Sequence, residues 1–352
     1  MLSDSELLQI VTLSLSACLL LAENTRQEQP LNRLRTFSMS EIRTREFNLE
    51  IVTYTDLESK SGLLPLLEQA FGWPFSEREF NRFIKIDPRL KNGAIGFCAL
   101  ENGRVVSYVG AMDLATRTLD GPIEHAGGIY GVATLPGYTR QGFSTALFKA
   151  THEYFKGKGY RFSFLNTSPI IVAYSLYKKL GYSDVYSYPS VYRVLNTTKA
   201  TLPKAKTLKL DLNKVLAIYD KYVRNKVGLV VRDRAYLEMH AKDKRLTSKN
   251  TLCTDEGYVV FRKEQYSTRI LEFVVQNKAE AERLVKTIEH RARGVVFARA
   301  VFDKTLRQIF LSRGYTLLDE GHDVFMVKLL ETETSFKQAY GEDFFQTQLD
   351  HF

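Results

Sequence analysis

From residue 47 onward, apolar and polar residues alternate in a regular way that predicts a mixed series of strands and helices. Alternation with a period of two predicts strands, and apolar residues three and four positions apart predict helices. The hairpin signal Glu101-Asn102-Gly103 separates two of the strands. Strands are predicted at 49–55, 94–100, 105–115, 123–135, 160–166 and 186–195, and helices at 63–71, 77–86, 143–157 and 172–180.

A second series of elements follows a polar, basic segment at 197–207, which is predicted to be a linker. Helices are predicted at 212–225, 234–241, 279–293 and 305–312, and strands at 257–262, 269–275, 295–301 and 323–329. Because this order repeats that of the first series, the pattern predicts a tandem duplication. The expected domains are 47–196 and 208–330, and 331–352 forms a tail. Antiparallel strands followed by a strand–helix–strand unit predict an α/β fold, an α+β sandwich in each copy.

The first 46 residues contain an apolar stretch at 7–22 that needs its own interpretation. Asp4 and Glu6 precede it and no Lys or Arg does, whereas a secretory segment begins with positive charge. The stretch is also short for a membrane span. The favoured interpretation is an appended helix or an overcalled start, with Met39 as the true start. A membrane anchor and a cleaved signal remain open, and membrane contact is expected only if this segment is real.

The 352 residues carry a net charge of +9, which favours an anionic partner such as nucleic acid, a membrane surface or a polyphosphate cofactor. There is no long block of Lys and Arg, so nucleic acid is not expected. Cys18, Cys98 and Cys253 lie far apart without metal-ligand spacing. They indicate neither a disulfide framework nor a metal site, and they fit a cytoplasmic protein best.

Residues 129–147 are the first segment with recognisable chemistry. A predicted strand runs through a short loop with glycine and basic residues into a helix. The N-terminus of a helix leaves backbone N–H groups without partners, and together with the helix dipole they attract an anion. Gly142 allows close approach of the backbone, and Thr139, Arg140 and Gln141 add donors and a charge. The pattern is typical of a pyrophosphate site, while the spacing of Rossmann and Walker loops is missing.

The six residues from Thr139 to Ser144 resemble the acyl-CoA loop of the GNAT acetyltransferase superfamily, usually written Q/R-x-x-G-x-G/A. Thr139 and Ser144 depart from its first and last positions. The resemblance implies that acetyl-CoA is the co-substrate. It implies that the strand end binds the pantetheine arm and polarises the thioester carbonyl, and that the loop binds the diphosphate. The cofactor-binding residues implied are Val132, Ala133, Thr134, Arg140, Gln141, Gly142, Phe143, Ser144 and Thr145.

A second motif, residues 173–182, resembles the A-x-x-L-Y-x-K-x-G-F/Y pattern of the same superfamily. A phenol next to the sulfur can protonate the CoA thiolate that acetyl transfer leaves behind. The resemblance makes Tyr177 this general acid, against the alternative of a packing tyrosine. Ile170 stands where the family often has Asn, so that pantetheine contact is either absent or supplied elsewhere, with Asn166 and Ser168 as the candidates.

The second copy has Phe310 where the first has Tyr177, and it has no glycine loop, which predicts a degenerate copy without a cofactor site. Tandem GNAT pairs of this kind resemble the enhanced intracellular survival family. In that family a free C-terminal carboxylate serves as base, which makes Phe352 the candidate here. The chain after residue 329 is too short for the third domain of that family. A disordered or surface-docked tail remains open.

Together these motifs predict an N-acetyltransferase that moves an acetyl group to a primary amine by direct attack. The acceptor is expected to be a small-molecule or peptide amine. An acyl or aminoacyl transferase with another donor, and a non-catalytic acyl-CoA sensor or scaffold, remain open. Glu124 and His125 are further candidates for a base or relay. The oligomeric state and the acceptor are not determined by the sequence.

Overall fold

The computed structural model describes residues 49–72, 76–91, 93–195, 209–292, 294–318, 323–331 and 333–351. The expectations for residues 1–46, for the linker 197–207 and for Phe352 lie outside the described residues. The described residues fall into two compact units. The first holds residues up to Arg82 together with Ala94–Gly110 and Gly131–Thr151. The second holds Phe83–Gly93, Ala111–Tyr130 and the residues from His152 onward.

The first unit begins with β1 (Glu50–Thr53), a 3-10 turn (Lys60–Leu63), α2 (Leu64–Phe71) and the start of α3 (Glu77–Ile86). β1 pairs antiparallel with β2 (Gly96–Glu101), and β2 pairs antiparallel with β3 (Arg104–Arg117). The hairpin between β2 and β3 is the predicted one. Asn102 and Gly103 have φ angles of 50° and 73°, the left-handed values that a type I′ turn requires at both central positions.

Besides α3, three elements run through both units: β3, β4 (Ile123–Thr134) and α4 (Phe143–Gly157). In the second unit, β4 pairs in parallel with β5 (Phe162–Thr167), to which α4 connects it. The chain continues through α5 (Val172–Lys179) into β6 (Ser183–Ser187). The order of this first sheet is β1-β2-β3-β4-β5-β14-β6.

The second sheet lies entirely in the second unit and has the order β13-β7-β12-β11-β10-β9. Its strands are β7 (Ser190–Val194), β9 (Thr251–Cys253), β10 (Gly257–Lys263), β11 (Ser267–Val275), β12 (Val295–Ala298) and β13 (Thr316–Leu318). β11 and β12 are parallel and are connected by α8 (Lys278–Arg291), and α9 (Lys304–Ser312) connects β12 to β13. α6 (Leu212–Tyr222) and α7 (Arg234–Lys242) precede the sheet in the chain.

The two sheets repeat one pattern of pairing, and each contains one strand from the other half of the chain. β5 pairs antiparallel with β14 (Val324–Leu329), and β14 with β6. At the corresponding places of the second sheet, β12 pairs antiparallel with β7, and β7 with β13. β14 thus comes from the predicted second domain, and β7 from the predicted first. The predicted domain boundaries remain a prediction. The structure shows in addition that the two sheets exchange one strand each, β7 and β14.

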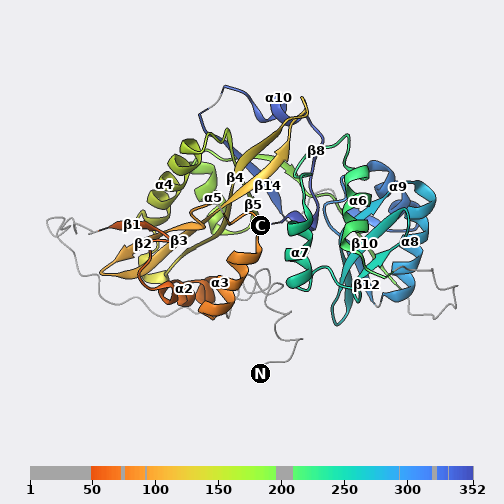
Figure 1. Cartoon of the computed structure of the whole chain (residues 1–352), viewed down its shortest axis with the longest axis horizontal. Helices are drawn as coiled ribbons and strands as arrows, with labels where there is room; N and C mark the ends of the chain where they lie inside the picture. Colours follow the sequence, from red (N-terminus) through yellow and green to blue (C-terminus); the bar gives the residue numbers. More distant parts are fainter. Residues whose placement is uncertain are drawn as a thin grey trace, which may run out of the picture. The chain divides into compact units, whose positions relative to one another are not determined.

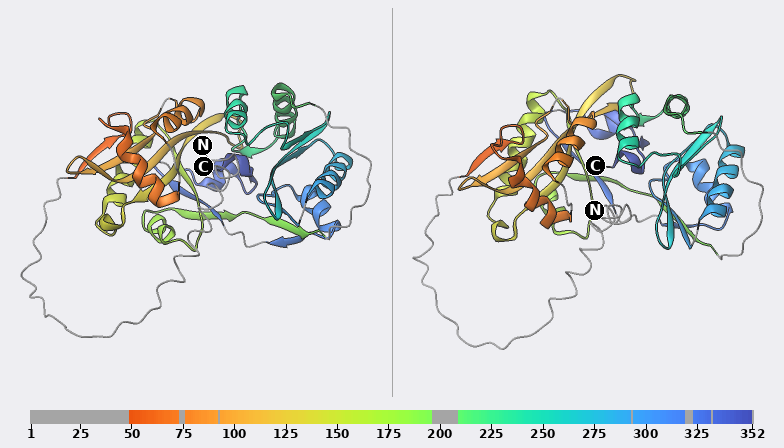
Figure 2. Two further views of the ribbon diagram at one scale, coloured as in Figure 1. Left: turned by 90° about the horizontal axis from the view of Figure 1, so that it is seen from below. Right: turned by 60° about the horizontal axis from the view of Figure 1, so that its bottom comes forward.

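The prediction of a single strand at 186–195 was wrong. The segment forms two strands, β6 and β7, that belong to different sheets, and the chain can be followed from one to the other in Figure 2. The break lies at Tyr188-Pro189, where proline supplies no N–H to a strand ladder. The carbonyl of Pro189 instead accepts from the N–H of Val301 at 2.9 Å.

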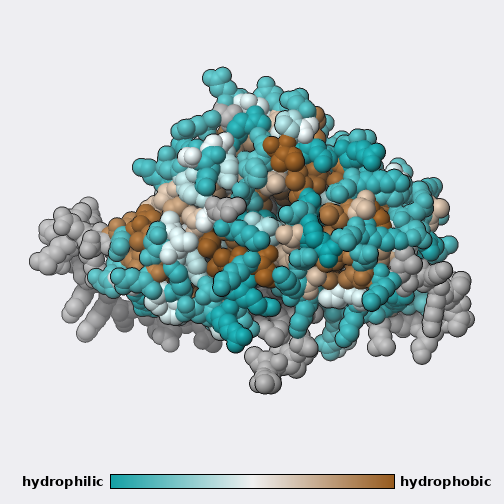
Figure 3. Space-filling view, in the orientation of Figure 1, coloured by the Kyte–Doolittle hydropathy of each residue, from teal (hydrophilic) through white to brown (hydrophobic). Residues whose placement is uncertain are grey.

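Helices cover both faces of the second sheet (Figure 1). Along β10, Val259 and Phe261 pack with apolar residues of α8 and α9. Tyr258 and Val260 point to the other face and pack with residues of α6 and α7. This alternation is the period of two that the sequence shows. On the face shown in Figure 3, apolar residues form separate patches among hydrophilic ones. Leu49, just before β1, and Ile51 within it are exposed apolar residues.

The C-terminal tail is part of the packed interior of the second unit. It forms α10 (Phe336–Tyr340), then β15 (Phe344–Phe345), which pairs in parallel with β8 (Val227–Gly228), and a last 3-10 turn (Gln348–Asp350). Tyr340, Phe344 and Leu349 are each at most 2% exposed. From residue 333 to residue 350 the tail is therefore neither disordered nor docked on the surface. In the part of the chain that the structure describes, no helix is long and apolar enough to span a bilayer.

His152 gives the fold a predicted dependence on pH. Its ring nitrogen Nε2 lies 3.0 Å from the hydroxyl of Tyr182, and burial lowers the pKa of His152 to about 4. Between pH 4 and the unfolded pKa of about 6.5, the unfolded chain binds more protons, so this contribution is complete above pH 6.5 and is lost as the pH falls. We expect a loss of about 2 kcal/mol in the free energy of unfolding between pH 7 and pH 5.

The measurement is urea unfolding of the wild type and of His152→Gln at both pH values. The difference between the two proteins isolates this side chain from other titrating groups. An equal dependence on pH in both proteins would contradict the assignment.

Candidate active site

The end of β4, which was predicted to bind the cofactor, is not paired with the neighbouring strand β5. The ladder between β4 and β5 consists of the pairs Gly127↔Ser163 and Gly128↔Phe164. β4 continues to Thr134, and Gly131 has a φ of 57°, a left-handed value that favours glycine and bends the strand. Beyond Gly128, one edge of the β4 backbone therefore lies outside this ladder, which gives it N–H and C=O groups that can bind a ligand.

Three hydroxyl groups connect the strand end to the following helix. Ser107 on β3 donates to the carbonyl of Ala133 at 2.9 Å and lies 2.7 Å from the hydroxyl of Thr134. Thr134 in turn lies 2.8 Å from the hydroxyl of Ser144. Since a hydroxyl donates only one hydrogen, Thr134 donates to Ser107 and Ser144 donates to Thr134. This relay fixes the helix start against the strand end, and it occupies the carbonyl of Ala133.

The loop between β4 and α4 is ordered by bonds within itself. The side chain of Gln141 donates to the carbonyl of Gly137 at 2.9 Å, and the hydroxyl of Thr139 donates to that of Pro136 at 3.0 Å. Arg140 and Gly142 have φ angles of 60° and 89°. The bond made by Thr139 shows why this departure from the family pattern is tolerated: its hydroxyl hydrogen stabilises the turn.

The first turn of α4 has the properties of an anion site. The N–H of Ala146 donates to the carbonyl of Gly142 at 3.0 Å, and this is the first hydrogen bond of the helix. Helix geometry directs the N–H groups before it, from Phe143 to Thr145, out of the helix end. No acidic residue lies in this turn, so the helix dipole acts on an approaching anion without a competing charge. Gly142 and the side chain of Arg140 are exposed at its mouth.

Tyr177 lies in the second unit, on the buried face of α5, with 6% of its surface exposed. Its ring packs edge-on against Tyr182, with centroids 6.3 Å apart. Burial raises the pKa of Tyr177 above that of a free phenol, so the hydroxyl stays protonated at all ordinary pH values. Gly181, with a φ of 88°, ends the helix behind it.

The residues proposed to replace the missing Asn are polar and lie at the end of β5. Ser168 is 5% exposed. The side-chain oxygen of Asn166 accepts from the hydroxyl of Tyr188, and Tyr188 also accepts from the side-chain amide of Gln346. Ile170 is 68% exposed and so contributes no buried contact. No local sequence signal points to Tyr188 or Gln346, because they come from distant parts of the chain.

Glu124 and His125 line a separate, open hollow of about 420 Å³. Nδ1 of His125 lies 2.5 Å from Asp113, and Glu124 accepts from Arg161 at 2.7 Å. Both carboxylates are thus engaged by neighbours within the second unit. The hollow is lined by Asp113, Glu124, His125, Lys158, Gly159, Tyr160 and Arg161.

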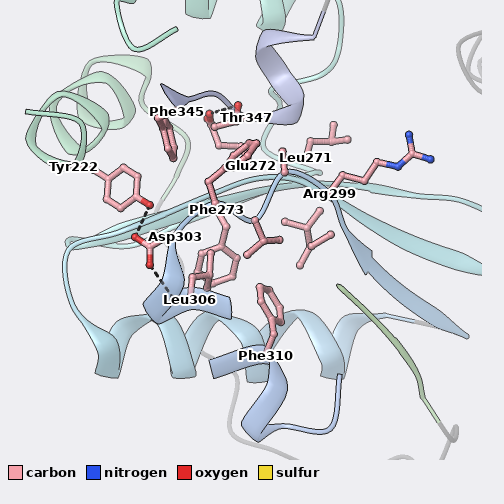
Figure 4. Close-up of a pocket in the computed structure, with 15 residues that line it drawn as sticks. Tyr222, Leu271, Glu272, Phe273, Arg299, Asp303, Leu306, Phe310, Phe345 and Thr347 are labelled. Atoms are coloured by element: carbon pink, nitrogen blue, oxygen red, sulfur yellow. Dashed lines mark hydrogen bonds between the residues drawn. The ribbon is translucent and has the colours of Figure 1, made fainter. Parts of the chain in front are cut away.

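In the second sheet, β11 corresponds to β4, and side chains occupy the space where its pairing with β12 ends. The pairing of β11 with β12 ends at Ile270↔Ala298, and the residues that follow in both segments line a cavity of about 30 Å³. Figure 4 shows Phe273, Phe310 and Phe345 among its lining, and Asp303 bonded to Tyr222. That volume holds about one water, whereas pockets for small molecules are about ten times larger. Phe310 is fully buried in the core.

The structure thus brings the strand end and the loop together in the first unit, through the bond between Thr134 and Ser144. The predicted contacts of Val132 and of loop residues 140–145 with a ligand stay predictions, as do the roles of Tyr177 and Phe352. Sequence reasoning missed Ser107, whose neighbours give no hint that it lies opposite Ala133. Within the described residues, no group of three or more His, Cys, Asp or Glu side chains could hold a metal ion.

Comparison with known proteins agrees with this architecture. Residues 53–185 match the family model of the acetyltransferase (GNAT) domain; this segment includes both motifs and ends before β7. No curated protein matches the sequence.

Several solved structures have a similar fold. The GCN5-related N-acetyltransferase from Kribbella flavida is 17% identical with a TM-score of 0.61, over 81% of this chain and 72% of that one. Eis1 from Mycobacterium abscessus is 17% identical with a TM-score of 0.52, over 80% of this chain and 73% of that one. A putative acetyltransferase from Pyrococcus horikoshii is 14% identical with a TM-score of 0.51, over 89% of this chain and 99% of that one. The predicted α/β fold class and the resemblance to GNAT proteins, Eis included, are confirmed.

The glycine at position 142 provides a test of the loop. A β-branched side chain is strongly disfavoured at its φ of 89°, so Gly142→Val shifts the turn and the N–H groups behind it. We expect the Kd for coenzyme A, measured by calorimetry, to rise by about tenfold or more.

Gly137→Ala is the matched control. Gly137 is not among the glycines with positive φ, and an added Cβ there meets no atom within 4 Å. Equal affinities in the two variants would show that the turn does not hold the cofactor.

Proposed function

We propose that this chain, whose residues 53–185 match the family model of the acetyltransferase (GNAT) domain, transfers an acetyl group from acetyl-CoA to a primary amine by direct attack. The observation that carries the proposal is the joint between strand end and helix start. There the hydrogen bonds among Ser107, Thr134 and Ser144 hold the end of β4, whose backbone is not paired with β5, next to the N-terminus of α4. The first turn of α4 contains no acidic residue.

In this proposal the first turn of α4 binds the diphosphate of acetyl-CoA. Backbone N–H groups of Gly142 to Thr145 donate to its oxygens, and Arg140 adds a positive charge. The pantetheine arm runs along the edge of β4 at Val132 to Thr134. Because the carbonyl of Ala133 is already occupied by Ser107, the backbone groups of its neighbours are the ones left to bind the arm and polarise the thioester carbonyl.

The chemistry then requires one proton donor and one proton acceptor. The amine nitrogen attacks the thioester carbonyl carbon, the C–N bond forms and the C–S bond breaks. Tyr177 gives its proton to the departing thiolate, and its raised pKa ensures that it carries that proton. The nitrogen releases its surplus proton to a base. By resemblance to the family, the terminal carboxylate of Phe352 is the candidate, and the acceptor is a small-molecule or peptide amine.

A non-catalytic acyl-CoA sensor is the second candidate. Two observations favour it: the hydroxyl of Thr139 is used within its own turn, and Ile170 is exposed where the family often has Asn. Both reduce contacts to the cofactor, but neither removes the proton donor. Binding of acetyl-CoA without thiol release against a broad set of amines would favour the sensor. Turnover with a different acyl-CoA in preference to acetyl-CoA would favour another donor.

Replacing one hydroxyl on α5 tests the mechanism. Tyr177→Phe removes the proposed proton donor and keeps the ring that packs on Tyr182. We expect kcat to fall about a hundredfold or more, with the Kd for acetyl-CoA unchanged. Thiol release and calorimetry measure the two quantities.

Tyr174→Phe on the same helix is the control, because Tyr174 is a partly exposed tyrosine whose hydroxyl donates to Asp184 at 2.6 Å. It should retain full turnover. Equal activity in the two variants would remove Tyr177 from the mechanism.

A further inference from the structure

The open hollow lined by Glu124 and His125 has the size of a small-molecule site, and the proposed acetyl transfer does not use it. Its volume is about 420 Å³, within the range of about 300–1,000 Å³ that is usual for such sites. Its lining comes from β3, from the start of β4 and from residues 158–161, just after α4. The predicted cofactor residues lie at the end of β4 and the start of α4. The hollow is therefore a separate surface with a chemistry of its own.

The imidazole of His125 is held in place by a carboxylate. Nδ1 of His125 lies 2.5 Å from an oxygen of Asp113, and the ring of His125 stacks on that of Tyr160 with centroids 6.4 Å apart. Burial raises the pKa of the Tyr160 phenol, and so does Asp113, to which the phenol is hydrogen-bonded. The phenol therefore keeps its proton and donates it to Asp113. Because Nδ1 is engaged, Nε2 of the half-exposed His125 is the nitrogen left for a ligand.

The second carboxylate of the hollow is bonded to two further side chains. Glu124 accepts from Nη2 of Arg161 at 2.7 Å, from Nε of the same guanidinium at 2.9 Å, and from the hydroxyl of Tyr340 at 2.5 Å. These bonds leave Nη1 of Arg161 for a ligand. Since both carboxylates already accept from charged or polar donors, their repulsion of an anion in the hollow is reduced.

Lys158 adds a positive charge that no carboxylate of the described residues pairs with. Its side chain is exposed, and Nζ lies 5.7 Å from the centre of the Tyr154 ring. An ammonium group has three N–H donors that rotate to suit a ligand. Nζ of Lys158, Nη1 of Arg161 and Nε2 of His125 are thus three nitrogen atoms available to a ligand, on side chains that line one hollow.

We propose that this hollow binds the phosphate group of a small phosphorylated molecule. Nζ of Lys158, Nη1 of Arg161 and Nε2 of protonated His125 donate to three oxygens, which a tetrahedral phosphate monoester offers and a planar carboxylate does not. When the imidazole is neutral, its Nε2 accepts the hydrogen of a monoprotonated phosphate instead. The volume exceeds that of a phosphate ion, so the rest of the molecule also lies in the hollow. The inference does not depend on the proposed acetyl transfer.

Calorimetry on the full chain, saturated with coenzyme A so that the predicted cofactor site is occupied, tests the site. We expect one further site that binds glycerol 3-phosphate at least as tightly as inorganic phosphate. Lys158→Gln removes one charged donor and should raise both Kd values about tenfold. Lys149→Gln is the control: Lys149 is an exposed lysine of α4 outside the hollow, and its loss changes the net charge equally. It should match the wild type.

Three results would overturn the proposal. Equal Kd values in Lys158→Gln and Lys149→Gln would show that phosphate is attracted by net charge alone. Loss of phosphate binding on saturation with coenzyme A would place the ion at the start of α4. Binding of inorganic phosphate without binding of glycerol 3-phosphate would exclude a phosphorylated molecule as the ligand.

Sulfate tests the role of His125, because it is tetrahedral like phosphate but does not titrate near neutral pH. An imidazolium donates from Nε2, whereas a neutral imidazole directs a lone pair at the anion. The other charged or titratable groups of the lining are Asp113, Glu124, Lys158, Tyr160 and Arg161. Side chains of these types ordinarily titrate outside the range from pH 5.5 to pH 8.5, so a change in affinity over this range reports the imidazole.

At constant ionic strength and saturating coenzyme A, we expect the Kd of the wild type for sulfate to rise about tenfold from pH 5.5 to pH 8.5. His125→Gln has an amide that donates at every pH, and its Kd should stay constant. A rise that persists in His125→Gln would remove His125 from the site. A crystal of the full chain soaked in glycerol 3-phosphate should show the phosphate group against Lys158 and Arg161, and a hollow that holds only water would overturn the proposal.

Discussion

The backbone pairing of β14 with β5 and β6 is the interaction on which the rest of the structure depends. β14 pairs with β5 from Val324↔Thr167 to Leu329↔Phe162, and its other edge pairs with β6. It thereby closes the gap between the strand that ends at Asn166 and Thr167 and the strand that follows α5. The tail that follows β14 can pack onto β5 only because β14 has brought the chain there. Phe344, for example, lies edge-on to Phe164, with centroids 5.8 Å apart.

The local sequence pattern was sufficient to predict most helices and strands, but it was insufficient to predict which strands pair with each other. The periodicity of residues 143–157 and the turn at Asn102-Gly103 are local signals, and the structure has α4 and the β2–β3 hairpin at those places. Residues 186–195 have strand character throughout, but a proline break and two different partner strands are properties of the whole fold. Nothing in residues 323–329 indicates that they pair with β5 rather than with their sequence neighbours.

The same distinction applies to the candidate site. Gly142 could be identified from sequence because a turn with positive φ demands glycine at that point. Ser107 could not, because its role depends on lying opposite Ala133 across two strands. Likewise Gln346 and Tyr188 are 158 residues apart in the chain, and no local motif links them. Residues that act alone through backbone geometry are visible in a sequence, and residues that act in pairs across the fold are not.

The reciprocal position of β7 and β14 also restricts how such a chain can be divided. A fragment ending near residue 196 would carry β7 without its partners β12 and β13, and its own sheet would present the edges of β5 and β6 to solvent. Exposed strand edges of this kind recruit other chains. The complementary fragment would have the converse defect. The two pieces are therefore suited to reassemble with each other, and an intact chain whose β14 paired with β5 of a second molecule would yield an intertwined dimer. A chain with this arrangement could therefore not easily lose either half.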